Sequence, residues 1–351
     1  MKKHRIALIG GARPNFMKLA PLAAALKKER LPFFIVNTGQ HFDTAMAGQF
    51  FDEFGLKPDY SLKPSRASVL RQMADIILGC EKVFMRVRPA VVVVVGDVNS
   101  TLCGAIAASK LGIPVAHVEA GLRSRNSAMP EETNRILTDH ISDLLFATEE
   151  SGMKNLAAEG LRARSRFVGN IMIDTLAAIL PDVPVSNDKF FFTTLHRAEN
   201  VDEKDVFTHI LDALEEIAKD APIYLPLHPR TKKMAAAFGF EKRLKRIFTL
   251  LPPLSYRETI FYEKNARLIL TDSGGIQEEA SFLGVSCLTL RTETERPITV
   301  TRGTNTVAGV TKDSILAAYR RVSFRRKKCR IPLWEGKAAE RIVRIIKKFL
   351  A

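Results

Sequence analysis

The chain has 351 residues, of which 46% are hydrophobic, and it carries a formal net charge of +15. A chain of this length exceeds the usual size of one hydrophobic core, so we expect two domains. The positive charge suits either a nucleic acid or a smaller polyanion as partner. However, the basic runs at 320–328 and 341–348 contain no aromatic pattern typical of RNA binding, so we interpret them as solvated faces and predict no nucleic-acid partner.

The sequence predicts neither membrane insertion nor export. The most apolar run, Ala90–Val95, ends at Gly96 and is far shorter than a bilayer span. Residues 1–5 lead directly into a strand pattern and not into a long apolar leader. The four cysteines form no CxxC pair and have no histidine at zinc spacing, which favours buried thiols in a reducing compartment. We therefore expect a cytoplasmic protein.

In the first half, short β-branched or aromatic runs alternate with helical periods, and this alternation predicts a parallel sheet with crossover helices. The predicted strands are Arg5–Ile9, Phe33–Asn37, Ala90–Val95, Val115–Glu119 and Asp143–Ala147. The predicted helices are Phe16–Glu29, Val69–Val87, Thr101–Leu111 and Glu132–Ser142. Residues 1–180 should therefore form a doubly wound α/β domain.

A segment with two prolines and no periodicity, residues 180–188, predicts the domain boundary. The alternation then restarts and predicts a second domain at 189–333, with strands at Lys189–Thr194, Ile223–Leu227, Arg267–Thr271 and Cys287–Leu290. A last helix within 334–351 has an apolar stripe and is expected to pack back toward the first domain.

A turn rich in small residues, Asp272–Gly275, connects a predicted buried strand to a helix. Glycines let backbone approach a ligand, and a helix N-terminus offers N–H groups to phosphate. The same residue pattern, however, also occurs in an ordinary βα turn that binds no ligand. Glu278 and Glu279 follow one turn later, where a carboxylate can accept hydrogen bonds from ribose or simply complement the helix dipole. There is no GxxxxGK[ST] loop and no GxGxxG after the first strand, which argues against ATPase and dinucleotide redox chemistry.

Polar residues follow several predicted strands, and the carboxyl ends of parallel strands meet at one edge of a sheet. These residues are Arg13, Gln40, His41, Asp97 and Glu119 in the first half, and His196, Arg197 and His228 in the second. A carboxylate at the end of an apolar strand is costly unless it is paired or used, so we favour function for Asp97 and Glu119, although Asp97 could instead cap a helix. Lys18 and Glu131 also have ordinary structural explanations.

Taken in order, several motifs resemble the non-hydrolysing UDP-N-acetylglucosamine 2-epimerases. They are GARPNFMK (11–18), TGQH (38–41), GDVNST (96–101), HVEAGLRS (117–124), MPEETNR (129–135), LHRAEN (195–200), LHPR (227–230), TDSGGIQEEA (271–280), TERP (294–297) and GTN (303–305). The resemblance spans nearly the whole chain. It implies two Rossmann-like domains of the glycosyltransferase-B type with an interdomain active-site cleft, no metal, no cofactor, and usually a homodimer.

The resemblance also implies roles for single residues. Positions that match catalytic residues of the family are Asp97, Glu119, Glu131 and His196. Positions that match residues holding the UDP-sugar are Arg13, Ser273, Gly274, Gly275, Glu279 and Arg296, and Lys18 joins them as a candidate because a cation near the first helix start could neutralise a diphosphate. Positions that match a possible activator site are Gln40, His41, Arg197 and His228. Two departures stand out: Thr259 replaces a usual aromatic residue near uracil, and PSRASVLRQM (64–73) replaces a more polar segment.

The reaction implied by the resemblance is epimerisation at C2 of the sugar, by elimination and readdition of UDP through a 2-acetamidoglucal. Alternatives within the same chemistry are an epimerase of a UDP-diacetamido-uronic acid and a hydrolysing 2-epimerase that releases N-acetylmannosamine. A glycosyltransferase and a non-catalytic nucleotide- or RNA-binding protein are more distant alternatives.

Overall fold

The computed structural model describes residues 5–40, 54–127 and 129–351, and forms two compact units. The first unit comprises Met1–Thr175 and Pro332–Ala351, and the second comprises Leu176–Ile331. The chain passes from one to the other within helix α7 (Ile171–Ile179), just before the proline-containing segment in which the sequence predicted a boundary.

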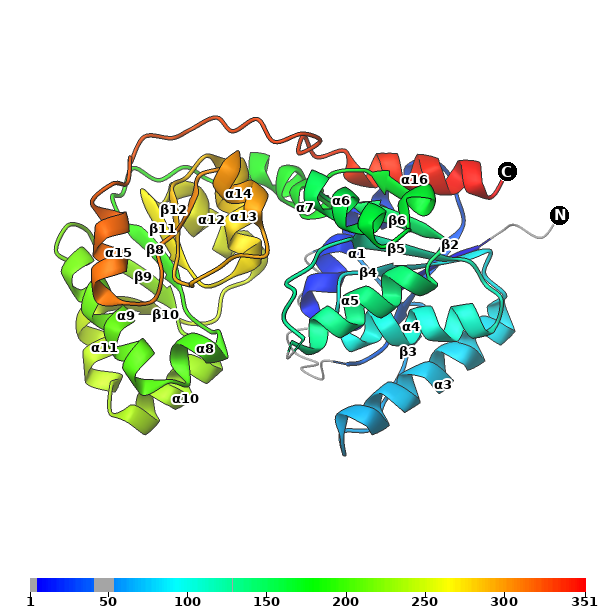
Figure 1. Cartoon of the computed structure of the whole chain (residues 1–351), viewed down its shortest axis with the longest axis horizontal. Helices are drawn as coiled ribbons and strands as arrows, with labels where there is room; N and C mark the ends of the chain where they lie inside the picture. The colour runs from blue at the N-terminus through cyan, green and yellow to red at the C-terminus, as the bar shows by residue number, and fades with distance from the viewer. Residues whose placement is uncertain (1–4, 41–53, 128) are drawn as a thin grey trace. The chain divides into compact units, whose positions relative to one another are not determined.

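The first unit is built on a seven-stranded parallel sheet with the order β3-β2-β1-β4-β5-β6-β7 (Figure 1). Its strands are β1 (Ile6–Gly10), β2 (Phe33–Asn37), β3 (Tyr60–Ser61), β4 (Val91–Val95), β5 (Val115–Ala120), β6 (Leu144–Ala147) and β7 (Ser165–Phe167). The central strands are buried on both faces, which explains why β4 reads as five consecutive valines.

Helices cover both faces of this sheet. They are α1 (Arg13–Lys28), α3 (Val69–Val87), α4 (Asn99–Lys110), α5 (Pro130–Ile141), α6 (Glu150–Ala158) and α16 (Ala338–Phe349), with a 3₁₀ turn at Arg162–Arg164. The C-terminal helix α16 (red in Figure 1) packs on α1, and its Ile342, Val343 and Ile346 join the core of the first unit. Asp174 accepts hydrogen bonds from the backbone N–H groups of Ala338 (3.0 Å) and Ala339 (2.7 Å), which anchors the start of α16.

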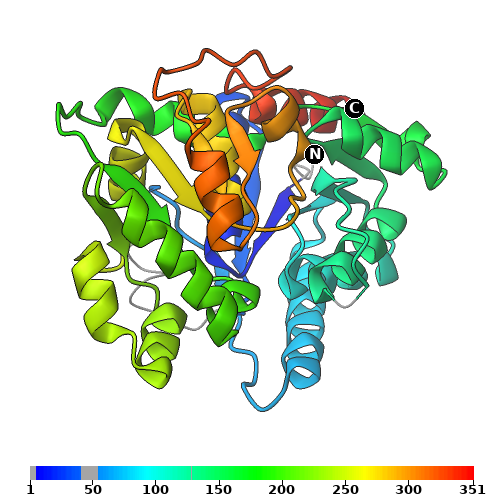
Figure 2. The same ribbon diagram turned by 60° about the vertical axis from the view of Figure 1, so that its left-hand side comes forward.

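The second unit repeats the plan with a six-stranded parallel sheet of order β10-β9-β8-β11-β12-β13. Its strands are β8 (Phe191–Thr194), β9 (Ile223–Pro226), β10 (Phe248–Leu251), β11 (Leu268–Thr271), β12 (Cys287–Thr289) and β13 (Asn305–Val307). Its helices are α8 (Ala198–Val201), α9 (Lys204–Ile217), α10 (Pro229–Phe238), α11 (Glu241–Ile247), α12 (Tyr256–Asn265), α13 (Gly274–Leu283), α14 (Pro297–Thr301) and α15 (Lys312–Tyr319), with a 3₁₀ turn at Leu180–Asp182. Helix α15 (orange in Figure 2) packs against α9.

These two sheets confirm the predicted α/β class with two Rossmann-like parts. The predicted strands and helices match observed elements to within a few residues. The additional strands β3, β7, β10 and β13 have only two to four residues and lie at sheet edges, where no hydrophobic period can develop. Within the described part of the chain, no helix is long and apolar enough to cross a membrane.

Candidate active site

Each sheet has one point at which the strand order reverses, and the candidate residues follow the strands at these points. In the first sheet the reversal lies between β1 and β4, and in the second between β8 and β11. Ligands of open α/β sheets bind outside the carboxyl ends of the strands at such reversals. Asn15 ties the first reversal together, because its amide donates to Val95 O (3.0 Å) and accepts from Gly11 N (3.2 Å).

Glu119 occupies an irregularity of strand β5. The pairing register with β6 shifts between Val118 and Ala120, and Glu119 has a φ of +75°. A non-glycine residue in the left-handed region costs about 1–3 kcal/mol, and bulges of this kind re-aim a side chain at the end of a strand. The strained backbone of Glu119 therefore supports a functional role for its side chain.

The carboxylate of Glu119 forms a buried ion pair with Lys18 of α1. The two side chains lie against Gly96, where a Cβ would stand 3.1 Å from Lys18 Nζ and 3.4 Å from Glu119 Oε2. Gly96 also has a φ of +71°, which glycine adopts without steric cost. Glycine at this position thus leaves the room in which the Lys18–Glu119 pair sits.

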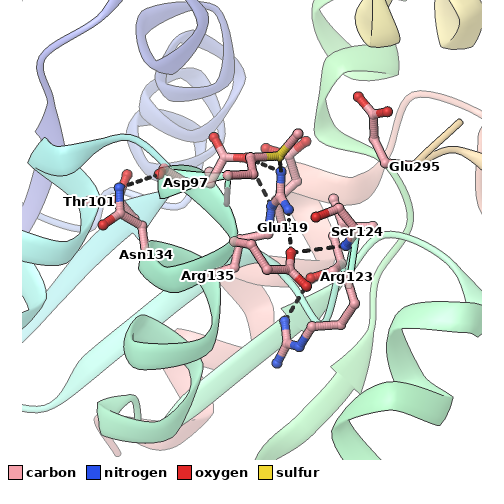
Figure 3. Close-up of polar contacts among 12 residues, drawn as sticks. Asp97, Thr101, Glu119, Arg123, Ser124, Asn134, Arg135 and Glu295 are labelled. Carbon is pink, nitrogen blue, oxygen red and sulfur yellow. Dashed lines mark hydrogen bonds and ion pairs between the residues drawn. The ribbon is translucent and has the colours of Figure 1, made fainter. Parts of the chain in front are cut away.

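Asp97, the next residue, is held by Arg135 of α5 (Figure 3). Arg135 donates to Asp97 Oδ2 from Nε (3.0 Å) and forms a second contact from Nη2 (2.9 Å). The same guanidinium pairs with Glu132 (2.6 Å), which in turn accepts from the backbone N–H groups of Ser124 and Arg125. The carboxylate of Asp97 is 32% exposed, so it is fixed in place and still reachable.

A fully buried network beneath these residues fixes the loop backbone. His117 Nδ1 bonds Asp139 Oδ1 (2.7 Å), and His117 Nε2 bonds the carbonyl oxygen of Gly96 (2.8 Å). Asp139 also pairs with Arg123 (2.8 Å) and accepts from Gly121 N (3.0 Å). Burial alone would raise the pKa of Asp139, but the hydrogen bond from His117 and the charge of Arg123 outweigh it and lower that pKa. The network fixes the backbone on both sides of Glu119.

In the second unit, His196 after β8 pairs with the buried Asp272 after β11, with 2.8 Å between His196 Nδ1 and Asp272 Oδ1. Asp272 also accepts from the backbone N–H groups of His196 (2.8 Å) and Arg197 (2.9 Å). Burial acts to raise the pKa of Asp272, but the bonds from His196 and Arg197 lower it overall. An ionised carboxylate on Nδ1 orients the imidazole and directs Nε2, the other ring nitrogen, away from it. The His196 side chain is 36% exposed.

His228 lies beside His196, with their ring centroids 5.5 Å apart. Its Nδ1 accepts a hydrogen bond from Arg230 N (3.2 Å) at the start of α10. Burial and the neighbouring His196 both lower the pKa of His228, which favours its neutral form.

Helix α13 begins directly after Asp272, with Ser273 as its N-cap and Gly274 as its first residue. The Ser273 side chain makes no capping hydrogen bond, and a Cβ on Gly275 would have only Ser273 Oγ nearby, at 4.0 Å. This helix start therefore has the space and the N–H groups that suit a phosphate. A Cβ on Gly274, however, would stand 2.8 Å from Glu295 Oε1. The chain thus places a carboxylate of its own at the N-terminus of α13.

Three arginines surround this Glu295 carboxylate. It pairs with Arg291 (2.6 Å) and Arg197 (3.2 Å), and the charge of Arg296 also acts on it. Burial raises the pKa of Glu295, but these arginines dominate and lower it to about 2. A cluster of arginines at a helix N-terminus is a strong binding environment for an anion.

The two acidic residues of α13 have different partners. Glu278 pairs with Arg296, with 2.8 Å between Arg296 Nε and Glu278 Oε1. Glu279 accepts a hydrogen bond from the Tyr256 hydroxyl on α12 (2.7 Å). Arg296 is thus positioned by Glu278, and Glu279 by the neighbouring helix.

Four predicted residues stand apart from these clusters. Arg13 begins α1, but its side chain and the whole of His41 lie outside what the structure describes. Gln40 accepts from both the N–H (2.8 Å) and the hydroxyl (2.6 Å) of Ser100, so its side chain is engaged at the start of α4. Glu131 is exposed in the first turn of α5, whereas its neighbour Glu132 is buried.

Several functional candidates were not singled out from the sequence. Arg135, His117 and Arg123 lie within quoted motifs, and their pairing with carboxylates appears only in the structure. Asp272 had a visible signal, since it ends a buried strand directly before the SGG turn. Among the described residues, no group of three or more His, Cys, Asp or Glu side chains is arranged to hold a metal ion.

The two sequence departures are accounted for locally. Thr259 donates its hydroxyl to Ser255 O (2.8 Å) within α12. In the 64–73 segment, Ser68 caps α3 by accepting from Arg71 N (3.1 Å), and Gln72 donates to the Gln40 carbonyl (3.2 Å).

Comparison with known proteins identifies the family. Residues 24–347 match the family model described as UDP-N-acetylglucosamine 2-epimerase. The UDP-N-acetylglucosamine 2-epimerase of Methanocaldococcus jannaschii is 42% identical over 97% of this chain and 98% of its own. A crystal structure of the M. jannaschii UDP-GlcNAc 2-epimerase with UDP-GlcNAc and UDP superposes with a TM-score of 0.87, at 41% identity over 98% of this chain and 99% of that one.

A second relative is named for a different substrate. The UDP-2,3-diacetamido-2,3-dideoxy-D-glucuronate 2-epimerase of Pseudomonas aeruginosa is 42% identical over 90% of this chain and 91% of its own. Family model, full-length identity and fold agree, and the chain belongs to the UDP-N-acetylglucosamine 2-epimerase family.

Proposed function

We propose that the chain interconverts UDP-N-acetylglucosamine and UDP-N-acetylmannosamine without hydrolysis. The observation that carries the proposal is the Lys18–Glu119 pair on a strained bulge, beside Asp97, at the strand reversal of the first sheet. The second unit supplies a histidine oriented by Asp272 and an arginine-rich helix N-terminus. Acid/base groups and an anion cradle are what this reaction requires. Action in the cytoplasm stays a prediction.

The proposed reaction balances as an elimination followed by an addition. Loss of the C2 proton to a base and departure of UDP with the C1–O electron pair leave a C1=C2 double bond. UDP then adds back to C1, and a proton is delivered to the opposite face of C2. The acid/base residues must therefore hold their positions while free UDP stays bound.

The residues divide into those two tasks. We propose that Asp97, Glu119, Glu131 and His196 act on the sugar, with Lys18 and Arg135 fixing the first two. We propose that UDP is held by Arg13, Lys18, Ser273, Gly274, Gly275, Glu279 and Arg296. A second nucleotide-sugar that acts as an activator would be bound by Gln40, His41, Arg197 and His228. Of these, Arg197 is already paired with Glu295.

A second substrate is supported by one comparison. The relative that acts on the UDP-diacetamido-glucuronate is as similar in identity as the relative named for UDP-N-acetylglucosamine, although its alignment covers less of the chain. Both substrates undergo inversion at C2, the carbon that bears an acetamido group, so the same residues serve either one.

The test is incubation in deuterated water with each nucleotide-sugar, followed by proton NMR. The proposal expects UDP-N-acetylmannosamine with deuterium at C2. Free N-acetylmannosamine would overturn it in favour of hydrolysis. Turnover of the diacetamido-glucuronate alone would replace the substrate and keep the reaction, whereas release of UDP only in the presence of a sugar acceptor would indicate a glycosyltransferase.

We also propose that the chain acts as a homodimer through helix α3. Leu70, Leu78 and Met85 are 79%, 53% and 62% exposed and lie on one side of this amphipathic helix. An apolar stripe of this kind on a helix marks an interaction surface, and a second copy is the simplest occupant. Light scattering should give twice the chain mass, and Leu70→Glu with Leu78→Glu should halve it. An unchanged mass would place the interface elsewhere.

A further inference from the structure

A buried acidic residue in the second unit has no place in the proposed reaction. Glu263 lies on α12 with no exposed surface, close enough to Cys287 of an apolar cluster for its charge to act on that thiol. No N–H or O–H donor of the described residues meets either of its carboxyl oxygens. An unpaired carboxylate in such surroundings is costly, and an apolar residue would pack there at less cost.

The group that faces Glu263 is another carboxyl, that of Glu279 on the adjacent helix α13, placed so that a hydrogen bond can join the two once one of them carries a proton. Carboxylates only accept hydrogen bonds, so this contact requires a proton on one of the two. Glu279 already accepts from the Tyr256 hydroxyl (2.7 Å), which favours its ionised form, whereas Glu263 is completely buried, which favours its neutral form. The shared proton therefore belongs to Glu263.

We propose that Glu263 is a positioning residue for nucleotide binding: as a carboxylic acid it donates to Glu279 and, together with Tyr256, holds that carboxylate to accept the ribose hydroxyls of a UDP-sugar. This inference rests on the proposed function, which assigns Glu279 to the nucleotide. It goes beyond that function because Glu263 touches only Glu279 in this role. Two partners from α12 leave Glu279 little freedom to rotate.

The arrangement makes nucleotide binding sensitive to pH on the alkaline side. Burial and Glu279 from α13 act on Glu263, Glu263 in turn acts on the thiol of Cys287 from β12, and Tyr256 acts through Glu279. Burial and the Glu279 charge raise the pKa of Glu263 well above its ordinary value of 4.5, so the acid form persists at neutral pH. Once Glu263 ionises, two like charges face each other and the hold on Glu279 is lost.

Protonation of Glu263 is also linked to stability. Because its pKa is raised in the folded chain, the stabilisation from this group is complete below pH 4.5 and is lost as the pH rises through the folded value. Glu263→Gln removes this dependence, so the variant should melt at a higher temperature than the wild type at pH 8. That difference should shrink as the pH falls toward 4.5.

The experiment is calorimetric titration of the full chain with UDP between pH 6 and 9.5, for two variants of contrasting chemistry. Glu263→Gln keeps a donor toward Glu279 but cannot ionise, so its UDP affinity should match the wild type at pH 7 and stay level at high pH. Glu263→Met fills the space without a donor and should lower the affinity for UDP roughly tenfold at every pH. A loss of this size is expected when one hydrogen bond to a charged group is removed. In turnover assays Glu263→Met should raise KM and leave kcat unchanged.

The ligand supplies the sharpest control. In 2′,3′-dideoxyuridine diphosphate the hydroxyls that Glu279 would accept are missing, so Glu263→Met and wild type should bind it equally. Glu258→Gln, on the same helix but in its exposed N-terminal capping box, controls for effects on α12 as a whole. It should leave the difference between the two ligands as in the wild type.

The outcomes separate the two proposals. If wild type binds UDP and epimerises, but Glu263→Met binds UDP as tightly as wild type, Glu263 is only a structural residue and the inference is overturned. The same conclusion holds if Glu263→Met weakens UDP and its dideoxy analogue alike. If wild type neither binds UDP nor turns over a UDP-sugar, the proposed function fails and this inference fails with it.

Discussion

The acidic groups of the two units are stabilised in different ways. In the first unit each buried carboxylate of the site faces a cation: Glu119 faces Lys18, and Glu132 shares Arg135 with Asp97. In the second unit, Asp272 is bonded to a histidine and Glu279 to a phenol, whereas Glu278 and Glu295 pair with arginines that gather around one helix start. The first arrangement holds individual carboxylates at defined atoms. The second leaves a concentration of positive charge for a ligand anion.

This difference implies that substitutions in the first unit should reduce kcat and substitutions in the second should mainly alter nucleotide affinity, with His196–Asp272 as the exception.

Glu119→Gln should lower turnover by about 10³-fold, since an amide can neither take nor return the proton. UDP affinity should be largely unchanged, because most of the residues that we propose hold UDP lie in the second unit. Asp97→Asn should behave in the same way. NMR of turnover together with calorimetry of UDP binding measures both quantities.

The matched control for that change is Glu340→Gln, which breaks an exposed ion pair with Lys28 elsewhere in the same unit. It should leave turnover intact, since exposed pairs contribute little. Because Glu119→Gln also leaves Lys18 buried without its partner, folding must be checked by circular dichroism. A folded Glu119→Gln variant with wild-type rates would remove Glu119 from the mechanism.

Asp272→Asn should lower kcat by about 10²-fold with little change in KM, because the amide no longer fixes the orientation and tautomer of His196. Steady-state kinetics with UDP-N-acetylglucosamine checks this. Asp212→Asn, which breaks a pair with Arg243 on α11 in the same unit, is the control. Equal losses in the two variants would indicate general destabilisation of the second unit.

Gly96→Ala should lower turnover roughly tenfold, because a misplaced catalytic group is costly and the new Cβ would stand 3.1 Å from Lys18 Nζ. Its φ of +71° adds a stability cost of about 1 kcal/mol. Gly112→Ala has a similar φ of +67° and a Cβ that meets nothing within 4 Å. It should show the stability loss in thermal melts and retain full activity. Equal activities in both variants would show that the space beside Gly96 is unimportant.

Glu295→Gln should bind UDP roughly two- to fivefold more tightly at low salt, since the amide no longer competes as an anion at the start of α13. Glu293→Gln, two residues earlier and exposed, is the control and should leave affinity unchanged. Weaker binding in Glu295→Gln would mean that Glu295 positions the arginines for the ligand.

The same residue predicts a pH effect of known sign. The pKa of Glu295 is lowered from 4.5 to about 2, so its contribution to the free energy of unfolding is present above pH 4.5 and is lost as the pH falls through 2. The contribution amounts to roughly 3 kcal/mol for this mostly buried side chain. Acid unfolding followed by fluorescence should therefore be less steep in Glu295→Gln than in the wild type.

Much of this molecule is determined by local sequence. The valine run of β4 and the alternation of strands with helices specify parallel sheets, because a strand buried on both faces must be apolar throughout. Residue type predicts the turns at Gly96–Asp97 and Asp272–Gly275, since glycine is needed where backbone bends sharply or approaches a ligand. The motifs that contain the candidate residues were therefore visible in the sequence.

Only the tertiary structure decided which charges meet. Lys18 and Glu119 are 101 residues apart, and no local pattern records their pairing. The left-handed φ of Glu119 arises from the register shift between β5 and β6, and Glu263 becomes a neutral acid only when α12 and α13 bury it against Glu279. Such features depend on burial and on the neighbours that folding supplies. The sequence determines which groups are present, whereas packing sets the ionisation and orientation of those groups.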